Sequence, residues 1–270
     1  MTLSKKLDII IADKTKSVSD RIGESINLIQ GIAPETVEYY QSSATVYNAI
    51  RNMVLEEENP SDNIGDLLIC NSLLAEIYQQ LNTPWLITPI AQHTYDLLED
   101  IEVDDQESIQ MIISVLDRMC YVLRGGAHHR LILKLYALEF RFLKLLNPIN
   151  KDALREISEE IIAISTLIQD NSILDTLREE IEIILDEKLI KEIVENPYVG
   201  NIIIDNIEYT LEYENVVDKV DETVAKEAEQ DPQKYNSLST IWQRKKEILC
   251  QQYNIDWNTP SELNPHTLFE

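Results

Sequence analysis

Residues 127–146 read AHHRLILKLYALEFRFLKLL, and this stretch decides the fold class that we expect. On a helical wheel of about 100° per residue, its basic side chains fall within one sector of about 80°. Leucine, isoleucine, phenylalanine and tyrosine occupy nearly all of the remaining circumference. A helix that is apolar on most sides belongs inside a core, so the pattern predicts a central helix with one polar stripe. The basic stripe consists of Arg130, Lys134, Arg141 and Lys144.

The segments on either side of this helix repeat the helical pattern. Gly125-Gly126 separates it from an amphipathic segment, and the whole chain contains only 6 glycines. Scarcity of glycine favours helices joined by short turns over a many-turned β fold. Further helices are expected near 67–81, 108–123, 152–168, 173–195 and 238–253. We therefore expect a mainly α fold, either a multi-helix bundle or an irregular α-solenoid.

One region departs from the helical period. Ile207, Tyr209, Leu211 and Tyr213 alternate with polar residues, which is the period of a strand. We therefore expect a small β-hairpin near 201–214 that turns at Asp205-Asn206. This places a helical domain over 1–198, followed over 199–270 by the hairpin, a helix and a C-terminal tail. An isolated hairpin is marginally stable, so we expect these parts to pack on the helical domain as one compact unit.

The C-terminal tail carries its own signals. Thr259-Pro260-Ser261-Glu262 has the form of a capping box with proline at the first helical position. Trp257 and Phe269 make the tail too apolar to float freely. The tail is therefore expected to dock on its own domain or to insert into a partner, and both aromatic residues are candidate binding residues.

Charge is distributed unevenly along the chain. The net charge is −25, which argues against generic binding to nucleic acids or anionic membranes. Residues 52–117 contain fourteen carboxylates and no lysine or arginine, whereas residues 118–151 contain seven basic side chains against Glu139 alone. Segregation of this kind predicts surfaces of opposite charge. The basic stripe is then a phosphate-tracking surface, a docking face for an acidic partner, or a solvated face that pairs with the acidic 52–117 region.

The run Arg124-Gly125-Gly126-Ala127-His128-His129 contains an Arg-x4-His spacing formed by Arg124 and His129. This spacing resembles the signature of the HEPN-type all-α ribonucleases. In that family an arginine and a histidine borne on helices polarise the phosphate and assist attack by the ribose 2′-hydroxyl. The resemblance implies a metal-independent ribonuclease with these two residues as its catalytic pair. The run departs from the family at the position after the arginine, which is usually polar.

Metal and cofactor chemistry have little support in the sequence. The motif HExxH is absent, as are a P-loop, GxSxG and a glycine-rich dinucleotide turn. Glu156/Glu159 and Glu179/Glu182 form carboxylate pairs similar to those with which all-α nucleotide pyrophosphohydrolases bind Mg²⁺. The second pair lacks the aspartate of that family. We expect no metal site and no cofactor.

These observations favour a non-enzymatic helical protein for protein–protein interaction or scaffolding, with an unknown protein as its partner. The alternative is an all-α ribonuclease or nucleotide hydrolase. No stretch approaches the roughly 20 apolar residues of a membrane span, and no secretory signal is visible. The three cysteines, Cys70, Cys120 and Cys250, form no CxxC pair. A cytoplasmic protein with reduced thiols is therefore expected.

Overall fold

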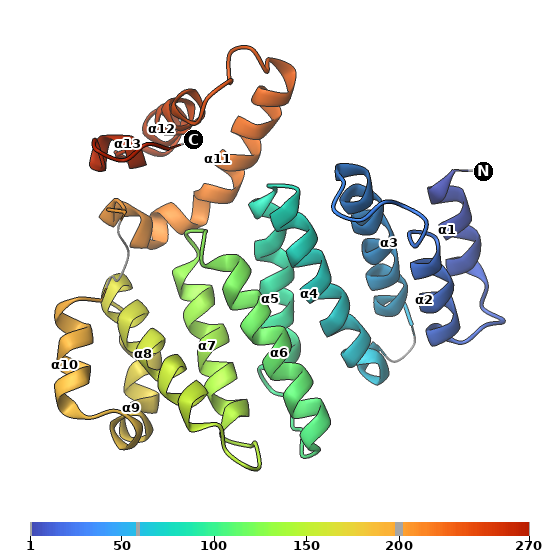
Figure 1. The fold of residues 1–270 in the computed structure, drawn as a ribbon, viewed down its shortest axis with the longest axis horizontal. Helices are drawn as coiled ribbons and strands as arrows, with labels where there is room; N and C mark the ends of the chain where they lie inside the picture. Colours follow the sequence, from blue (N-terminus) through green and yellow to red (C-terminus); the bar gives the residue numbers. More distant parts are fainter. Residues whose placement is uncertain (1, 58–59, 198–201, 270) are drawn as a thin grey trace. The chain divides into compact units, whose positions relative to one another are not determined.

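The computed structural model describes residues 2–57, 60–197 and 202–269, and within these residues all regular structure is helical (Figure 1). The chain divides into two compact units. The first comprises Met1–Val122 and Leu145–Asn147, and the second comprises Leu123–Lys144 and Pro148–Glu270. The expectation of a mainly α protein is confirmed, and a helical bundle fits. None of the helices in the described residues combines the length and the apolar character that a membrane span requires.

The first unit is built from helices that pack on their neighbours in the sequence. Side-chain caps begin several of them: the hydroxyls of Thr2, Ser17 and Thr36 each accept a hydrogen bond from a backbone N–H three residues later. From α1 to α5, consecutive helices lie side by side, with the most extensive contact between α3 and α4. The elements are α1 (Leu3–Ala12), α2 (Val18–Asn27), α3 (Val37–Leu55), η1 (Pro60–Asn63), α4 (Ile64–Gln80), η2 (Pro84–Leu86), α5 (Ile87–Leu98) and α6 (Gln106–Leu123).

One apolar cluster of the first unit lies between α1, α3 and α4. Ile50 and Val54 of α3 are fully buried in a cluster that includes Leu7 and Leu67. Arg21 is also buried, and its guanidinium donates to the Glu57 carboxylate at 2.8 Å. The apolar stripe of each helix therefore covers the stripe of the next, which is how short, amphipathic helices gain stability.

The second unit is organised around α7, the helix that residues 127–146 predict. Ten of its fifteen residues are buried, which agrees with its apolar circumference. Helix α8 packs along α7, and α9 and α10 pack against α8. The elements are α7 (His129–Leu143), α8 (Lys151–Ile168), α9 (Ser172–Ile184), α10 (Glu187–Glu195), η3 (Asn206–Tyr209), α11 (Leu211–Gln230), α12 (Leu238–Tyr253) and α13 (Pro260–Leu263).

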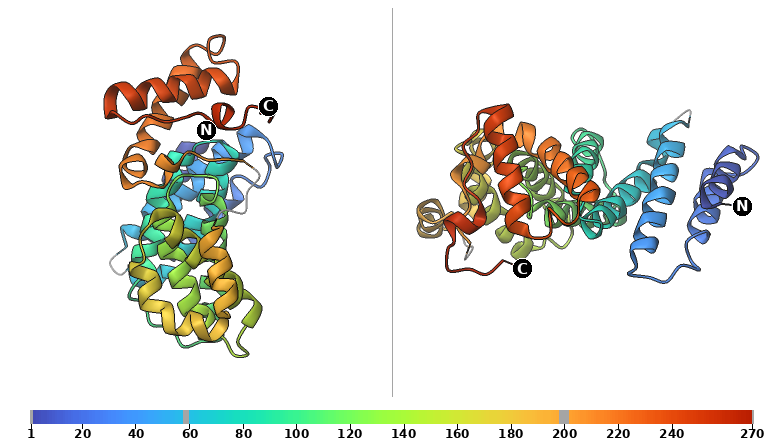
Figure 2. Two further views of the ribbon diagram at one scale, coloured as in Figure 1. Left: turned by 90° about the vertical axis from the view of Figure 1, so that its left-hand side faces the viewer. Right: turned by 90° about the horizontal axis from the view of Figure 1, so that it is seen from above.

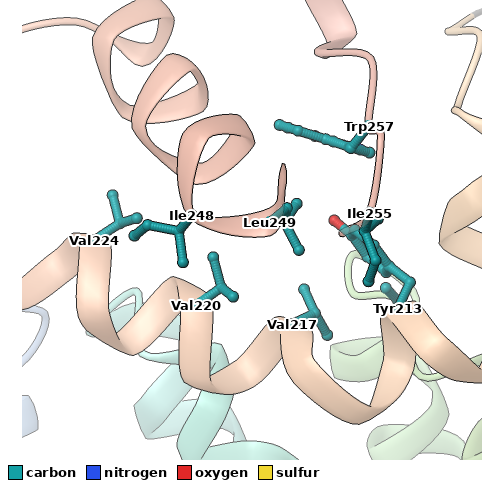
Figure 3. Close-up of a cluster of buried hydrophobic side chains, with 9 residues drawn as sticks. Tyr213, Val217, Val220, Val224, Ile248, Leu249, Ile255 and Trp257 are labelled. Carbon is teal, nitrogen blue, oxygen red and sulfur yellow. The ribbon is translucent and has the colours of Figure 1, made fainter. Parts of the chain in front are cut away.

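The helices α11 and α12 lie against each other, as both views of Figure 2 show, and enclose a second apolar cluster. Side chains of α11 at helical spacing point toward Ile248 and Leu249 of α12 (Figure 3). Ile255 and Trp257 close one end of the cluster. The residues contributed by α11 are Tyr213, Val217, Val220 and Val224.

The β-hairpin expected near 201–214 is wrong, because the described residues from 202 onward contain no strand. Asn206–Tyr209 is a 3-10 helix, and Leu211 begins α11. The Thr210 hydroxyl accepts from the Tyr213 amide at 3.3 Å and so caps the helix. The apparent alternation ends at Tyr213, which is instead the first member of the buried helical set on α11. The helical conformation of residues 211–214 is therefore decided by the apolar core between α11 and α12, and the local alternation of apolar and polar residues does not decide it.

The boundary that the sequence suggested between 198 and 199 falls on residues outside the described part of the chain, and it stays a prediction. The C-terminal elements nevertheless belong to the same compact unit as α7 to α10. At the far end of the chain, the predicted capping box is present. The Thr259 hydroxyl accepts from the Glu262 amide, and the Glu262 carboxylate accepts from the Thr259 amide at 2.7 Å.

Candidate functional site

The start of α7 gathers several titratable side chains of the second unit. The Nε2 atom of His128 lies 2.8 Å from Oδ1 of Asp218 on α11. Because a carboxylate only accepts, Nε2 carries the hydrogen in this contact. The ring of His129 lies 4.7 Å from the ring of Tyr209 in a tilted arrangement. The two adjacent histidines therefore connect α7 to α11 and to η3, respectively.

Arg130 continues this connection. Its Nη1 atom donates to Oε1 of Glu214 at 3.1 Å and to the backbone oxygen of Tyr209 at 3.1 Å. The Glu214 side chain is only 8% exposed, so this ion pair is largely withdrawn from water. Burial raises the pKa of Glu214, and the charge of Arg130 opposes that rise. Arg130 thus offsets part of the cost of burying the Glu214 carboxylate at the junction of α7 and α11.

Arg124 lies just before this cluster, between the end of α6 and the start of α7. The break between the two helices at Gly125-Gly126 agrees with the sequence analysis. The Nε atom of Arg124 donates to the Tyr136 hydroxyl at 2.8 Å, and its Nη2 atom donates to Glu160 at 3.0 Å. The Arg124 side chain is 54% exposed. The two residues of the Arg-x4-His spacing therefore have different partners: α7 and α8 for Arg124, and η3 for His129.

Burial sets the protonation state of His129. It lowers the pKa of His129 to about 4, and the positive charges of His128 and Arg130 act in the same direction. His129 is therefore neutral at physiological pH. The Glu208 carboxyl nearby has a raised pKa, again because of burial, although a hydrogen bond from Trp257 opposes the shift. In this region, burial at the junction of the helices shifts the pKa of both His129 and Glu208 toward the neutral form.

The low pKa of His129 predicts acid sensitivity of the second unit. Above about pH 6.5 the imidazole is neutral in both the folded and the unfolded chain. Between about pH 6.5 and 4 the unfolded chain binds a proton on this imidazole, whereas the folded chain does not. Stability from this group is therefore lost as the pH falls from about 6.5 to 4, by about 1 kcal/mol at pH 5.5 and about 3 kcal/mol in full. Urea unfolding at about pH 7.5 and 5.5, where the protein keeps net negative charge, measures the loss.

The control for this prediction is His129→Phe, which keeps an aromatic ring against Tyr209 and removes the titration. We expect the variant to lose less stability than the wild type between the two pH values. Other groups, including His93, whose pKa burial also lowers, titrate equally in both proteins. Equal losses in the two proteins would contradict the assignment of the pH dependence to His129.

The basic stripe of α7 is partly used inside the second unit. Arg130 pairs with Glu214 of α11, and Lys144 pairs with Glu180 of α9. The guanidinium of Arg141 lies 4.7 Å from the centre of the Phe142 ring, and Lys134 is exposed. The acidic partner of Arg130 thus comes from α11, and that of Lys144 comes from α9. Outside the stripe, Arg118 on α6 pairs at 3.0 Å with Glu76, which does belong to the acidic 52–117 segment.

The aromatic residues of the tail pack within the second unit. Trp257 is 2% exposed, and its Nε1 atom donates to Oε1 of Glu208 at 2.7 Å. The ring of Phe269 lies 5.1 Å from that of Trp242 in an edge-to-face arrangement. Both candidate binding residues therefore have partners on their own unit.

The carboxylate pairs named in the sequence analysis have separate surroundings. Glu159 pairs with Arg155 at 3.0 Å along α8, and Glu182 lines a cavity beside α9. Across the described residues, no group of three or more histidine, cysteine, aspartate or glutamate side chains is placed to hold a metal ion.

That cavity was not predicted from the sequence. It lies where α8, α9 and α10 meet and has a volume of about 350 Å³. Its apolar lining comes from Ile162 of α8, Leu174 and Ile181 of α9, and Ile190 and Val194 of α10. A volume of this size is near the lower end of ligand-binding pockets. Its existence depends on how three helices meet, which no single stretch of sequence specifies.

Searches of protein-family models, of curated proteins and of solved structures find no match to this chain. Two features stand out in the second unit, the titratable junction at the start of α7 and the cavity between α8, α9 and α10.

The first unit contains a polar network that the sequence analysis also missed. Arg51 of α3 donates to Oδ1 of Asn71 at 2.9 Å, and its Nη2 atom lies 3.1 Å from Nδ1 of His93. Asn71 is fully buried and donates to the Thr94 hydroxyl at 3.1 Å. Burial, followed by the charge of Arg51, lowers the pKa of His93. These bonds satisfy polar groups between α3, α4 and α5 and specify how the three helices align.

Proposed function

We propose that this chain is a non-enzymatic helical protein that recognises another protein, as an interaction or scaffold protein. The observation that carries the proposal is the internal use of the catalytic candidates. Arg124 donates to Tyr136 and Glu160, and the half-buried His129 packs its ring against that of Tyr209. Contacts of this kind hold helices together, which supports a structural role for both side chains.

The surface charge supports a protein as the partner. The chain carries a net charge of −25, and exposed carboxylates such as Glu179, Glu187 and Glu192 cover α9 and α10. A negative surface repels nucleic acids and anionic membranes, and it accelerates encounter with basic proteins. Ion pairs within the second unit already use Arg130 and Lys144 of the basic stripe, which weakens the case for a phosphate-binding surface.

Incubation with short labelled RNA, with and without Mg²⁺, tests the non-enzymatic part of the proposal. The proteins compared are the wild type, Arg124→Ala and His129→Phe, at low and at moderate salt. We expect neither cleavage nor stable binding by any of them. Cleavage by the wild type that disappears in both variants would establish the alternative, a ribonuclease similar to the HEPN type.

Crosslinking in the cells of origin, followed by reconstitution with the purified partner, tests the interaction itself. We expect a saturable complex whose affinity falls as the salt concentration rises, because opposite charges steer the two proteins together. Failure to recover any protein that binds directly after purification would contradict an interaction role.

A further inference from the structure

The cavity of the second unit lies between α9 and α10, beside the C-terminal part of α8. Its floor is the last part of α8, including Ile162 and Ser165. One wall is α9, through Ile181, and the other is α10, through Ile190 and Val194. Both α9 and α10 pack on α8, so the two walls rest on a common floor. The lining is mainly aliphatic along the walls, with polar groups at the floor and the rim.

The apolar face of α10 is only partly covered. The helix is amphipathic, yet none of its residues is buried, and Val194 remains 46% exposed. An amphipathic helix normally gains its stability by covering such a face completely. The wall that α10 contributes therefore offers aliphatic surface that a second molecule can cover.

The floor of the cavity holds an unused polar group. Ser165 is fully buried, and its hydroxyl oxygen has no hydrogen-bond partner among the described residues. Buried hydroxyls are normally satisfied, so this one requires an explanation. Ser165 lies in the last turn of α8, where the helix ends at Gln169 in a left-handed conformation with φ of 55°. The carbonyl end of a helix is its negative pole, and it favours a cation.

The two helices that form the walls of the cavity, α9 and α10, are acidic. Residues 170–195 carry nine carboxylates against three basic side chains. One of the three bases, Arg178, lines the cavity and pairs with Asp175 at 2.6 Å. Glu182 also lines the cavity, and it is exposed. The net negative charge of these two helices thus favours a cationic occupant over an anionic one.

We infer that this cavity receives a lysine or arginine side chain from a basic, amphipathic segment of a partner protein. The aliphatic stem lies between Ile181 and Val194, as long basic side chains do on apolar surface. The cationic tip lies at the exposed Glu182 carboxylate on the rim, toward the negative end of α8. Other apolar residues of the segment cover α10. This inference rests on the proposed function, since it names the partner's chemistry and the surface that meets it.

Selection from a library of random peptides of about 15 residues, long enough to form a helix, tests the inference on the full-length protein. The selection is made in salt of about 150 mM, which screens weak surface attraction. We expect the enriched peptides to be basic and to contain aliphatic residues. Their affinity should fall about tenfold or more in Val194→Arg, which fills the cavity and places a positive charge inside it.

Ile183→Arg is the matched control. Ile183 is 85% exposed on α9 and does not line the cavity, so the same chemical change occurs outside it. We expect this variant to bind the peptides as the wild type does. Glu182→Lys and Glu179→Lys form a second pair, in which only the first changes the cavity and only the first should weaken binding. Thermal unfolding of all four variants confirms that they fold.

Replacement of the key lysine of a selected peptide by norleucine separates the stem from the charge. Norleucine keeps most of the aliphatic chain, so a loss of affinity reports the cationic tip. Equal binding by Val194→Arg and Ile183→Arg, enrichment of neutral or acidic peptides, or no enrichment at all would each overturn the inference.

These outcomes are distinguishable from failure of the proposed function. A purified cellular partner that binds wild type and Val194→Arg equally would leave the interaction role intact and place the contact elsewhere. Cleavage of RNA that depends on Arg124 and His129 would refute the non-enzymatic role, whatever the peptides do at the cavity.

Discussion

Replacing Trp257 with alanine is expected to lower the free energy of unfolding of the second unit by about 3–5 kcal/mol. Trp257 is 2% exposed and packs with Tyr213 and Ile255 at the end of the apolar cluster between α11 and α12 (Figure 3). Its indole N–H also donates to the Glu208 carboxylate, and the ammonium group of Lys245 lies 5.4 Å from the centre of its ring. The substitution therefore opens a cavity and leaves the half-buried Glu208 carboxylate without this donor. Urea unfolding followed by circular dichroism measures the loss.

Two variants control this measurement. Trp257→Phe keeps much of the apolar volume and removes the hydrogen bond, so a loss of about 1–3 kcal/mol is expected. Leu268→Ala changes a side chain that is 93% exposed in the same tail, and its effect should stay within about 0.5 kcal/mol. A similar stability for Trp257→Ala and Leu268→Ala would mean that the tail contributes little to the second unit.

Arg130→Met is expected to destabilise the second unit by about 3–5 kcal/mol, the usual cost when one partner of a buried ion pair is removed. The Glu214 side chain is 8% exposed, so without Arg130 its charge loses both water and its counter-ion. Arg130 also donates to the backbone oxygens of Tyr209 and Ile168, and these bonds are lost as well. Methionine preserves the apolar stem, so the effect reports the charge and the hydrogen bonds.

The pH dependence of Arg130→Met supplies an internal check. Without Arg130, the pKa of Glu214 rises further above its ordinary value, because the opposing positive charge is gone. A carboxyl group with a raised pKa in the folded state binds protons preferentially there, so its penalty shrinks as the pH falls. We therefore expect a smaller destabilisation at about pH 5.5 than at about pH 7.5.

Two further variants serve as controls for the destabilisation caused by Arg130→Met. The double variant Arg130→Met/Glu214→Gln should recover part of the stability, since no uncompensated charge remains. Arg155→Met breaks an exposed pair with Glu159 on α8 and should change stability little. Equal effects of Arg130→Met and Arg155→Met would show that the α7–α11 junction does not depend on its ion pair.

Signals that act within a few residues were recoverable from the sequence. The apolar circumference of residues 127–146, the break at Gly125-Gly126 and the capping box at Thr259-Pro260-Ser261-Glu262 all have the structures that they predict. Each depends on neighbours along one helix or turn, so the sequence alone contains the necessary information.

The hairpin expected near 201–214 failed for the opposite reason. Four apolar residues at alternate positions are compatible with a β-strand and also with the start of an amphipathic helix. A sequence window this short does not distinguish the two structures. A longer window shows apolar residues at helical spacing from Tyr213 to Val217 and Val220, preceded by Thr210 as an N-cap. Together these features indicate a helix. What selects the helix is its packing on Ile248 and Leu249 of α12, residues that lie well downstream in the chain.

By itself, the sequence determined that the protein is mainly α, that α7 is a largely buried helix with one basic stripe, and that the chain is charge-segregated. Only the tertiary structure decided which carboxylates meet Arg130 and Lys144, where Trp257 is buried, and that α8, α9 and α10 leave a cavity between them. The physical reason is the range of the interactions involved. Helix formation and capping are local, whereas ion-pair partners, burial and cavities depend on which distant helices meet.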